Sequence, residues 1–213
     1  MNLTFFQRII RLIFGLFLFA LGVVMQIQAQ VGYAPWDVFH VGLSKTFGLS
    51  IGQVTILAGI VIVLVIWLLK EPIGLGTLGN MLLIGTFVDL IMSTHLIPRM
   101  TNPVLGIGLL IAGLFVISLA SYFYIGSGFG AGPRDALMVT LHRHVGLSIG
   151  WSRSLVELAA TVVGWFLGGM VGIGTILACG GLGIVMQFMF RLLKFDPKDI
   201  VHETFTDYFR PKA

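Results

Sequence analysis

The chain alternates long apolar runs with short polar or glycine-rich connections. A helix needs about 20 mostly apolar residues to cross the hydrocarbon core of a bilayer. Runs of about that length predict membrane-spanning helices near residues 10–31, 51–69, 73–97, 104–126, 149–169 and 172–193. The pattern therefore predicts an all-α membrane protein, a polytopic helical bundle with about six transmembrane helices.

Two further elements, near residues 35–46 and 133–145, are too short to span. At about 1.5 Å per residue each reaches less than about 20 Å, against a core of about 30 Å. Each begins with a proline, which suits the first turn of a helix, and each ends before a glycine, Gly48 or Gly146, which suits a helix end. We expect two short broken helices that re-enter the membrane or lie at its surface.

Composition supports the membrane assignment, because 57% of the residues are hydrophobic and only 10% are charged. A soluble domain averages about 25% charged residues. The Lys and Arg residues lie between the apolar runs, a pattern of membrane topology that argues against a nucleic-acid partner. Cys179 is the single cysteine, and no Cys or His spacing fits a metal site, so we expect no metal.

A gap-free internal repeat organises the chain. Shifting the sequence by 98 residues aligns segment 11–92 with segment 109–190, with 25 of 82 positions identical. This predicts a first membrane repeat over 1–98, a second over 99–195 and a short tail over 196–213. The identities gather in three blocks: Gly32-x-x-Pro35-x-Asp37 with Gly130-x-x-Pro133-x-Asp135, Gly48-Leu49-Ser50-Ile51-Gly52 with Gly146-Leu147-Ser148-Ile149-Gly150, and Gly74-x-Gly76-Thr77 with Gly172-x-Gly174-Thr175.

The number of crossings sets the relative orientation of the repeats. Three crossings per repeat is an odd number, so the second repeat is expected to be inserted upside down. With the N-terminus inside, every Lys and Arg except Lys45 and Arg99 falls in a predicted inner segment, which agrees with the positive-inside rule. We therefore expect a multi-pass protein of the cell membrane with both termini in the cytoplasm.

Inverted repeats with interrupted helices are typical of secondary transporters, whose sites lie near the membrane midplane where the broken helices meet. The N-terminus of a short helix also offers unpaired N–H groups to a solute. The sequence predicts a transporter or permease for a small polar or ionic solute. The predicted substrate-binding residues are Gly32, Pro35, Asp37, Gly130, Pro133, Arg134, Asp135 and Glu157.

The two repeated aspartates have a structural and a functional interpretation. At the third helical position, Asp37 and Asp135 can accept backbone N–H bonds and meet the helix dipole favourably. Alternatively, each is a buried carboxylate that binds a cation or carries a proton. Arg134 replaces Trp36 of the first repeat. It either binds an anion or gates the site, or it pairs with Asp135.

Glu157 lies in the middle part of an apolar run, four residues after Arg153. That spacing places both on one helix face, so a neutralised pair is one interpretation and a proton or ion site is the other. Asp89 lies nearer a membrane edge and is weaker evidence for a site.

Other polar residues have mainly structural interpretations. The glutamines at the end of the first helix are expected to hydrogen-bond between helices, with a cavity lining as the alternative: Gln26, Gln28 and Gln30. The histidines beside the short elements are interpreted as interfacial: His40, His142 and His144. The Gly74-x-Gly76-Thr77 block and its repeat copy are expected to allow tight packing.

Gly48-Leu49-Ser50-Ile51-Gly52 matches the nucleophile elbow of serine hydrolases. That motif requires a preceding strand, whereas here it lies between membrane helices and occurs twice. Ser50 with Gln53 fits a helix-capping box better. We therefore expect no enzyme.

In the tail, a stripe of apolar residues predicts either an interfacial helix or an ordinary solvated segment: Ile200, Val201, Phe205, Tyr208 and Phe209.

The arrangement of these motifs resembles the YczE/YyaS/YitT group of bacterial membrane proteins over about residues 8–195. The likeness is strongest to the YczE branch, in which a segment like Pro35-Trp36-Asp37 recurs as Pro-Arg-Asp in the second half, here Pro133-Arg134-Asp135. The resemblance implies the fold and the membrane location, and it implies no cofactor and no catalytic residue.

Two functional classes follow. The first is the transporter, whose partners are the lipid bilayer and a small solute. The second is a non-transporting membrane scaffold or accessory protein that stabilises a partner complex. A homodimer is left open.

Overall fold

The fold was analysed in a computed structural model that describes residues 4–71 and 73–200. This part of the chain contains eight α-helices and no strand. Both short helices and all six long ones lie within a few residues of the predicted ranges. In chain order they are α1 (Phe5–Gln28), α2 (Pro35–Phe47), α3 (Ile51–Leu68), α4 (Leu75–Ser93), α5 (Pro103–Ile125), α6 (Pro133–Val145), α7 (Ile149–Phe166) and α8 (Ile173–Leu192), followed by one 3-10 turn, η1 (Pro197–Asp199).

Five helices of the described ranges are long and apolar enough to cross a membrane, namely α1, α3, α4, α5 and α8. The chain is therefore a multi-pass membrane protein. Helix α7 is not among the five, because Arg153 and Glu157 lower the mean hydropathy of its 18 residues. The count of six crossings stays a prediction. The predicted apolar stripe of the tail lies outside the described residues from Val201 onward.

The helix ends follow the local sequence. Ser50 and Gln53 form the predicted capping box of α3: the Ser50 amide donates to Gln53 Oε1 at 3.0 Å and the Gln53 amide to Ser50 Oγ at 3.1 Å. Helices α2 and α6 begin at proline and end at Gly48 and Gly146, as predicted. Ser50 therefore has a structural role at a helix N-terminus.

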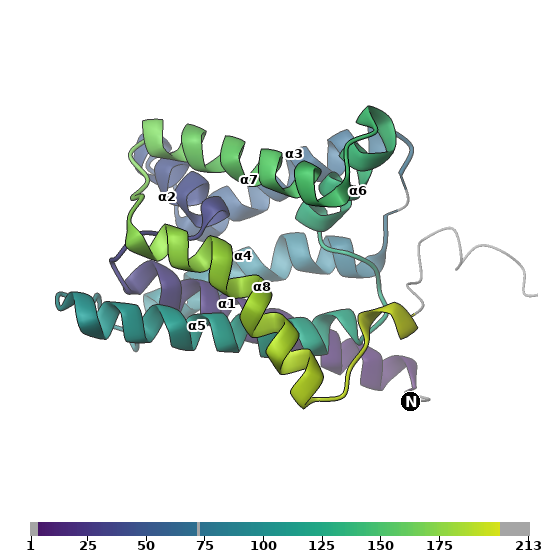
Figure 1. Cartoon of the computed structure of the whole chain (residues 1–213), viewed down its shortest axis with the longest axis horizontal. Coiled ribbons are helices and arrows are strands. Elements are labelled where there is room, and N and C mark those ends of the chain that lie inside the picture. The colour runs from purple at the N-terminus through teal and green to yellow at the C-terminus, as the bar shows by residue number, and fades with distance from the viewer. Residues whose placement is uncertain (1–3, 72, 201–213) are drawn as a thin grey trace, which may run out of the picture.

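Helices α1 and α5 pack along one another and run in opposite directions (Figure 1). Helix α4 packs on α1, and α8 packs on α5. The short helices α2 and α6 lie toward opposite ends of the long axis (Figure 1). Helix α2 packs mainly on α7, while α6 contacts both α3 and α7.

In each repeat, the glycine-rich loop before the short helix hydrogen-bonds to the start of the last helix of the other repeat. The Gly76 amide at the start of α4 donates to the Phe129 carbonyl at 2.7 Å, and the Gly174 amide at the start of α8 donates to the Val31 carbonyl, also at 2.7 Å. The repeat alignment matches Gly76 with Gly174 and Val31 with Phe129, so the two hydrogen bonds are equivalent, each with its donor in one repeat and its acceptor in the other. The tight packing predicted for the Gly74-x-Gly76-Thr77 block is therefore present.

Gly32 and Gly130 shape these loops. Both have φ of +107°, a conformation that side chains other than glycine rarely adopt. A Cβ on Gly32 would also lie 2.6 Å from the Gly172 amide nitrogen. Both glycines are thus required where the loop of one repeat passes the helix start of the other.

The two repeats differ in how their last two helices meet. Helices α3 and α4 pack closely, and a Cβ on Gly85 would lie 2.5 Å from the Gly52 carbonyl oxygen. The repeat equivalents, Gly150 of α7 and Gly183 of α8, are exposed, and no atom of the other helix lies near them in the described chain. We call the first contact the α3–α4 seam and the second, open pair of helices the α7–α8 seam.

Candidate functional site

A cavity of about 330 Å³ lies between the repeats, and all eight helices contribute to its lining. The first turns of both short helices face it, over residues 34–37 and 132–135. Most of the remaining lining is apolar, including Phe19, Ile84 and Leu114. A concave, mostly apolar space with a few convergent polar groups is typical of a small-molecule site, and this one has room for a single small solute.

The structure brings six of the eight predicted site residues to this cavity: Pro35, Asp37, Pro133, Arg134, Asp135 and Glu157. Gly32 and Gly130 are not among the lining residues. They lie in the loops that cross from one repeat to the other, so their positions support a role in folding, and binding through them stays a prediction.

Asp37 and Asp135 differ in access. Asp37 is only 3% exposed. Asp135 is exposed and lines the cavity. Within the described chain neither carboxylate accepts a hydrogen bond, and neither helix N-terminus has a side-chain cap. The capping interpretation therefore finds no contact to support it.

Arg134 is held by aromatic side chains of the first repeat. Its Cζ lies 4.8 Å from the centroid of the Trp36 ring, and its Nη2 lies 3.4 Å from His40 Nδ1. The guanidinium also interacts electrostatically with Asp37, Asp135 and Glu157, although no carboxylate oxygen approaches it within 4 Å in the described residues. The proposed direct pair with Asp135 is therefore not formed in this structure.

His40 corrects an expectation. It was predicted to be interfacial, but it is 2% exposed and lines the cavity. Its Nδ1 lies 3.4 Å from Arg134 Nη2 and 3.2 Å from the Thr55 hydroxyl oxygen, and the adjacent guanidinium disfavours a second positive charge on the imidazole. The helical spacing alone gave no sign of this, because burial of α2 results from packing on α7.

Glu157 pairs with Arg153, as one of the two interpretations predicted. The distance from Arg153 Nε to Glu157 Oε1 is 2.9 Å, and both residues line the cavity. The Arg153 side chain is half exposed and that of Glu157 is 21% exposed. The pair neutralises itself on the face of α7 that looks toward the cavity.

Three buried polar atoms at the cavity have no hydrogen-bond partner within the described structure: Gln26 Oε1, Tyr124 OH and Trp36 Nε1. An unsatisfied buried polar group costs about 1–3 kcal/mol. A bound solute or water is therefore expected there. The sequence did not lead us to predict Tyr124 as a cavity residue. The repeat alignment places it at the position of Gln26, and this correspondence could have identified it. The other glutamines act structurally, since Gln28 Nε2 donates to the Ile97 carbonyl at 3.0 Å.

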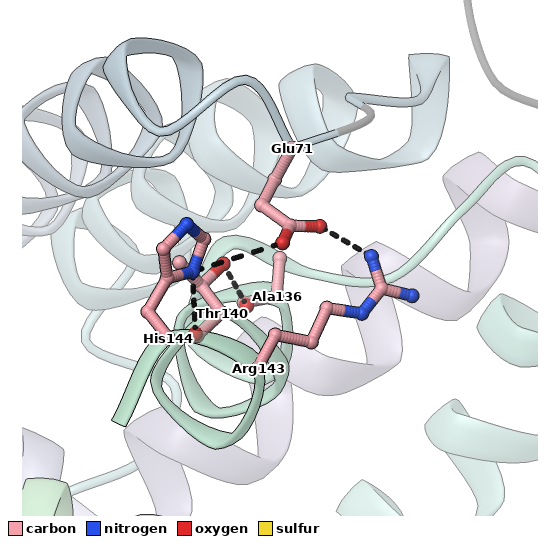
Figure 2. Close-up of polar contacts among 5 residues, drawn as sticks. All are labelled: Glu71, Ala136, Thr140, Arg143 and His144. Carbon is pink, nitrogen blue, oxygen red and sulfur yellow. Dashed lines mark hydrogen bonds and ion pairs between the residues drawn. The ribbon is translucent and has the colours of Figure 1, made fainter. Parts of the chain in front are cut away.

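A second polar cluster fixes the far end of α6 to the loop between α3 and α4 (Figure 2). Arg143 Nη1 lies 2.6 Å from Glu71 Oε2, and His144 Nδ1 lies 4.0 Å from Glu71 Oε1. At the equivalent place in the other half, Lys45 Nζ donates to the Gly168 carbonyl at 2.8 Å. Each short helix is thus tied at its C-terminus to a loop of the opposite repeat.

No group of three or more His, Cys, Asp or Glu side chains is arranged to hold a metal ion over residues 4–71 and 73–200.

Comparison with known proteins gives related sequences without an assigned activity. A family described as "Family of unknown function (DUF6198)" matches residues 6–191. The Bacillus subtilis "Uncharacterized membrane protein YczE" is 35% identical over 176 residues, covering 82% of this chain and 81% of that protein. An "Uncharacterized protein" of Haemophilus influenzae is 30% identical over 188 residues, covering 88% and 85%. "Uncharacterized protein YyaS" of Bacillus subtilis is 29% identical over 182 residues, covering 82% and 89%. No solved structure matches the chain significantly.

Proposed function

The chain belongs to the DUF6198 family, a family of unknown function, and from its membrane-spanning helices and its cavity we propose that it is a secondary transporter for a small polar or ionic solute. The YczE-like resemblance predicted from the motifs is confirmed by these relatives. The observation that carries the proposal is the cavity, which is lined by both short-helix N-termini and by unpartnered buried polar atoms. Broken helices that meet at a central polar site are the usual construction of transporter sites.

The proposal includes inverted repeats. Reciprocal contacts support it, because Gly76 bonds to Phe129 while Gly174 bonds to Val31, with donor and acceptor at equivalent positions. The opposite directions of α1 and α5 and the placement of α2 and α6 at opposite ends agree with a twofold relation (Figure 1). Such a relation would give the protein two equivalent conformations in which the halves exchange roles.

The two seams suggest which helix contacts would open and which would close between the two proposed conformations. In the closed α3–α4 seam, Asp89 Oδ1 accepts from the Gly52 amide at 2.8 Å, and Asp89 Oδ2 accepts from Ser50 Oγ at 2.5 Å. The equivalent residue of α8 is Gln187, whose exposed side chain makes no hydrogen bond in the described chain. Its amide oxygen is an acceptor like that of a carboxylate. In the second conformation α7 and α8 would close through Gly150 and Gly183, with Gln187 in the role of Asp89.

Orientation follows from the charge pattern. We place both termini in the cytoplasm of a cell with the protein in its cell membrane, so that Arg143 and Glu71 mark the cytoplasmic end. The structure modifies one part of that argument, because Arg134 and Arg153 line the cavity and do not belong to an inner loop. Their removal from the count still leaves Lys45 and Arg99 as the outer cations. The activity that we assign to the site is binding and transport of the solute, with no covalent bond made or broken.

Uptake into proteoliposomes tests transport. A panel of radiolabelled small amines, amino acids and carboxylic acids would be offered to vesicles that contain the purified protein. We expect saturable uptake of at least one class, reduced at least tenfold by Asp135→Asn, and retained by the control Asp199→Asn, which removes an acid outside the cavity. Asp135 is open to the cavity, so its substitution should leave the thermal unfolding temperature nearly unchanged. Uptake no greater than in protein-free vesicles for every class would contradict the proposal, and loss of folding in Asp135→Asn would favour the scaffold class.

A further inference from the structure

The charge balance of the cavity leaves its acids in excess. The charged lining residues are three acids, Asp37, Asp135 and Glu157, and two arginines, Arg134 and Arg153. His40 is counted as neutral because the Arg134 guanidinium beside it disfavours a second positive charge. With all three acids ionised, the lining carries one more negative than positive charge. A helix N-terminus adds only about half a positive charge, and the first turn holds Asp37 without a basic residue in α2 and Asp135 together with Arg134 in α6.

The arginines are occupied and the aspartates are not. Arg153 pairs with Glu157 at 2.9 Å, and Arg134 lies over Trp36 with its Nη2 on His40. In the part of the chain that the structure describes, no Lys, Arg or His nitrogen lies within 4 Å of an Asp37 or Asp135 oxygen. A cation supplied by the solute would meet two carboxylates that no protein cation neutralises directly.

The unpartnered polar atoms also favour a hydrogen-bond donor. Gln26 Oε1 is an acceptor and the Tyr124 hydroxyl accepts as well as donates. Both residues are less than 5% exposed and both line the cavity. Together with the two carboxylates they form a set in which acceptors outnumber donors, since only Trp36 Nε1 is exclusively a donor.

The arrangement fits an organic cation better than a bare metal ion. The acids do not converge, since no three of them in the described ranges are grouped as metal ligands. The volume of about 330 Å³ and the apolar lining from Phe19, Ile84 and Leu114 suit an alkyl portion. We propose that the cavity binds a small organic ammonium ion, whose N–H groups donate to the Asp37 and Asp135 carboxylates and to Gln26 and Tyr124. This assignment rests on the proposed transport function and names its substrate class.

Binding can be measured apart from transport, by thermal unfolding of the purified protein in detergent. The probes are n-butylammonium, tetramethylammonium, sodium and n-butyrate, added at equal ionic strength. A ligand that binds only the folded protein raises its stability with concentration. We expect n-butylammonium to raise the unfolding temperature saturably and to exceed tetramethylammonium, which has the charge but no N–H, and sodium, which has no alkyl group.

Matched variants locate the effect. Asp135→Asn is expected to weaken n-butylammonium binding at least tenfold, because it removes a cavity-facing carboxylate without removing packing. Asp37→Asn is expected to act in the same direction, and the control Asp199→Asn to leave binding unchanged. Equal stabilisation by sodium, stronger stabilisation by n-butyrate, or unchanged n-butylammonium binding in Asp135→Asn would each overturn the assignment. Ammonium binding without uptake in vesicles would support this site while contradicting transport, so the two failures are distinguishable.

Discussion

The guanidinium carbon of Arg134 lies 4.8 Å from the centroid of the Trp36 ring, and the repeat alignment places these two residues at the same position. Equivalent residues of two halves can touch only close to the axis that would relate the halves. The same cavity receives Asp37 and Asp135, another equivalent pair. The contact of Arg134 with Trp36 therefore marks the centre of the proposed site and the point at which the two repeats differ chemically.

Arg134 should stabilise the fold through Asp37. Arg134→Met removes a cation that interacts with the buried Asp37 carboxylate from beyond ion-pair distance, so the cost should be smaller than the about 3–5 kcal/mol typical of breaking a buried ion pair. We expect a clear loss of stability in chemical unfolding experiments. The double variant Asp37→Asn with Arg134→Met should recover part of the loss, by on the order of 1 kcal/mol. Strict additivity of the two single variants would show that the charges do not interact.

The two seams predict opposite effects of the same substitution. Gly85→Ala places a Cβ against the Gly52 carbonyl and should destabilise the protein by about 1–3 kcal/mol. Gly183→Ala meets open space and should be neutral or stabilising by up to about 1 kcal/mol, because alanine favours helix. Thermal unfolding of the two variants gives the comparison, and equal losses would contradict the seam assignment.

Gly183→Leu extends this comparison to function. In the structure described here its side chain has room, so folding should be retained. In the proposed second conformation α7 and α8 must close at this position, and the larger side chain should reduce uptake at least tenfold. Normal uptake by a folded Gly183→Leu protein would exclude closure of the α7–α8 seam.

The native cysteine reports the open seam directly. Both Cys179 of α8 and its equivalent, Met81 of α4, line the cavity, but Cys179 is exposed whereas Met81 is half-buried and packs on Gly59. We expect a water-soluble maleimide to label Cys179 at least tenfold faster than Met81→Cys in a Cys179→Ser background. Labelling at equal rates would mean that both seams are equally open in the purified protein.

The Glu71–Arg143 ion pair should contribute little to stability. The Arg143 side chain is 57% exposed, and exposed ion pairs are usually worth about 0–1 kcal/mol. We expect Arg143→Gln to lower the free energy of unfolding by no more than about that amount. In the Arg143→Gln background, the further substitution Glu71→Gln should cost much less than it does in the unchanged protein, because the partner of Glu71 is already absent. A loss of several kcal/mol would indicate that the cluster in Figure 2 is a major fold determinant.

Most of the fold could be predicted because its signals are local. Apolar run length, proline at the start of α2 and α6, and glycine at their ends predicted every helix to within a few residues. The repeat then predicted which loops would be equivalent. Gly32 and Gly130 were assigned to binding because they lie in the repeated broken-helix segments, and the structure places them where the backbones of the two repeats cross.

The composition of the cavity was less predictable. Tyr124 and His40 lie in it because of how α5 and α2 pack, and depth within a bundle is not encoded in a single helix. The difference between the seams was also beyond the sequence, since Gly52 and Gly85 are matched by Gly150 and Gly183. Identical residues cannot indicate which of two equivalent contacts is closed.

Inversion of the repeats is the central claim, and impermeant-thiol labelling of intact cells tests it most directly. In a Cys179→Ser background one cysteine would replace Lys45 or its repeat equivalent Arg143, both of which are exposed in the structure. The account predicts that Lys45→Cys is labelled from outside, and that Arg143→Cys is labelled only after the membrane is opened. Labelling of both from the same side would mean that the halves are parallel, and it would contradict the inverted-repeat transporter.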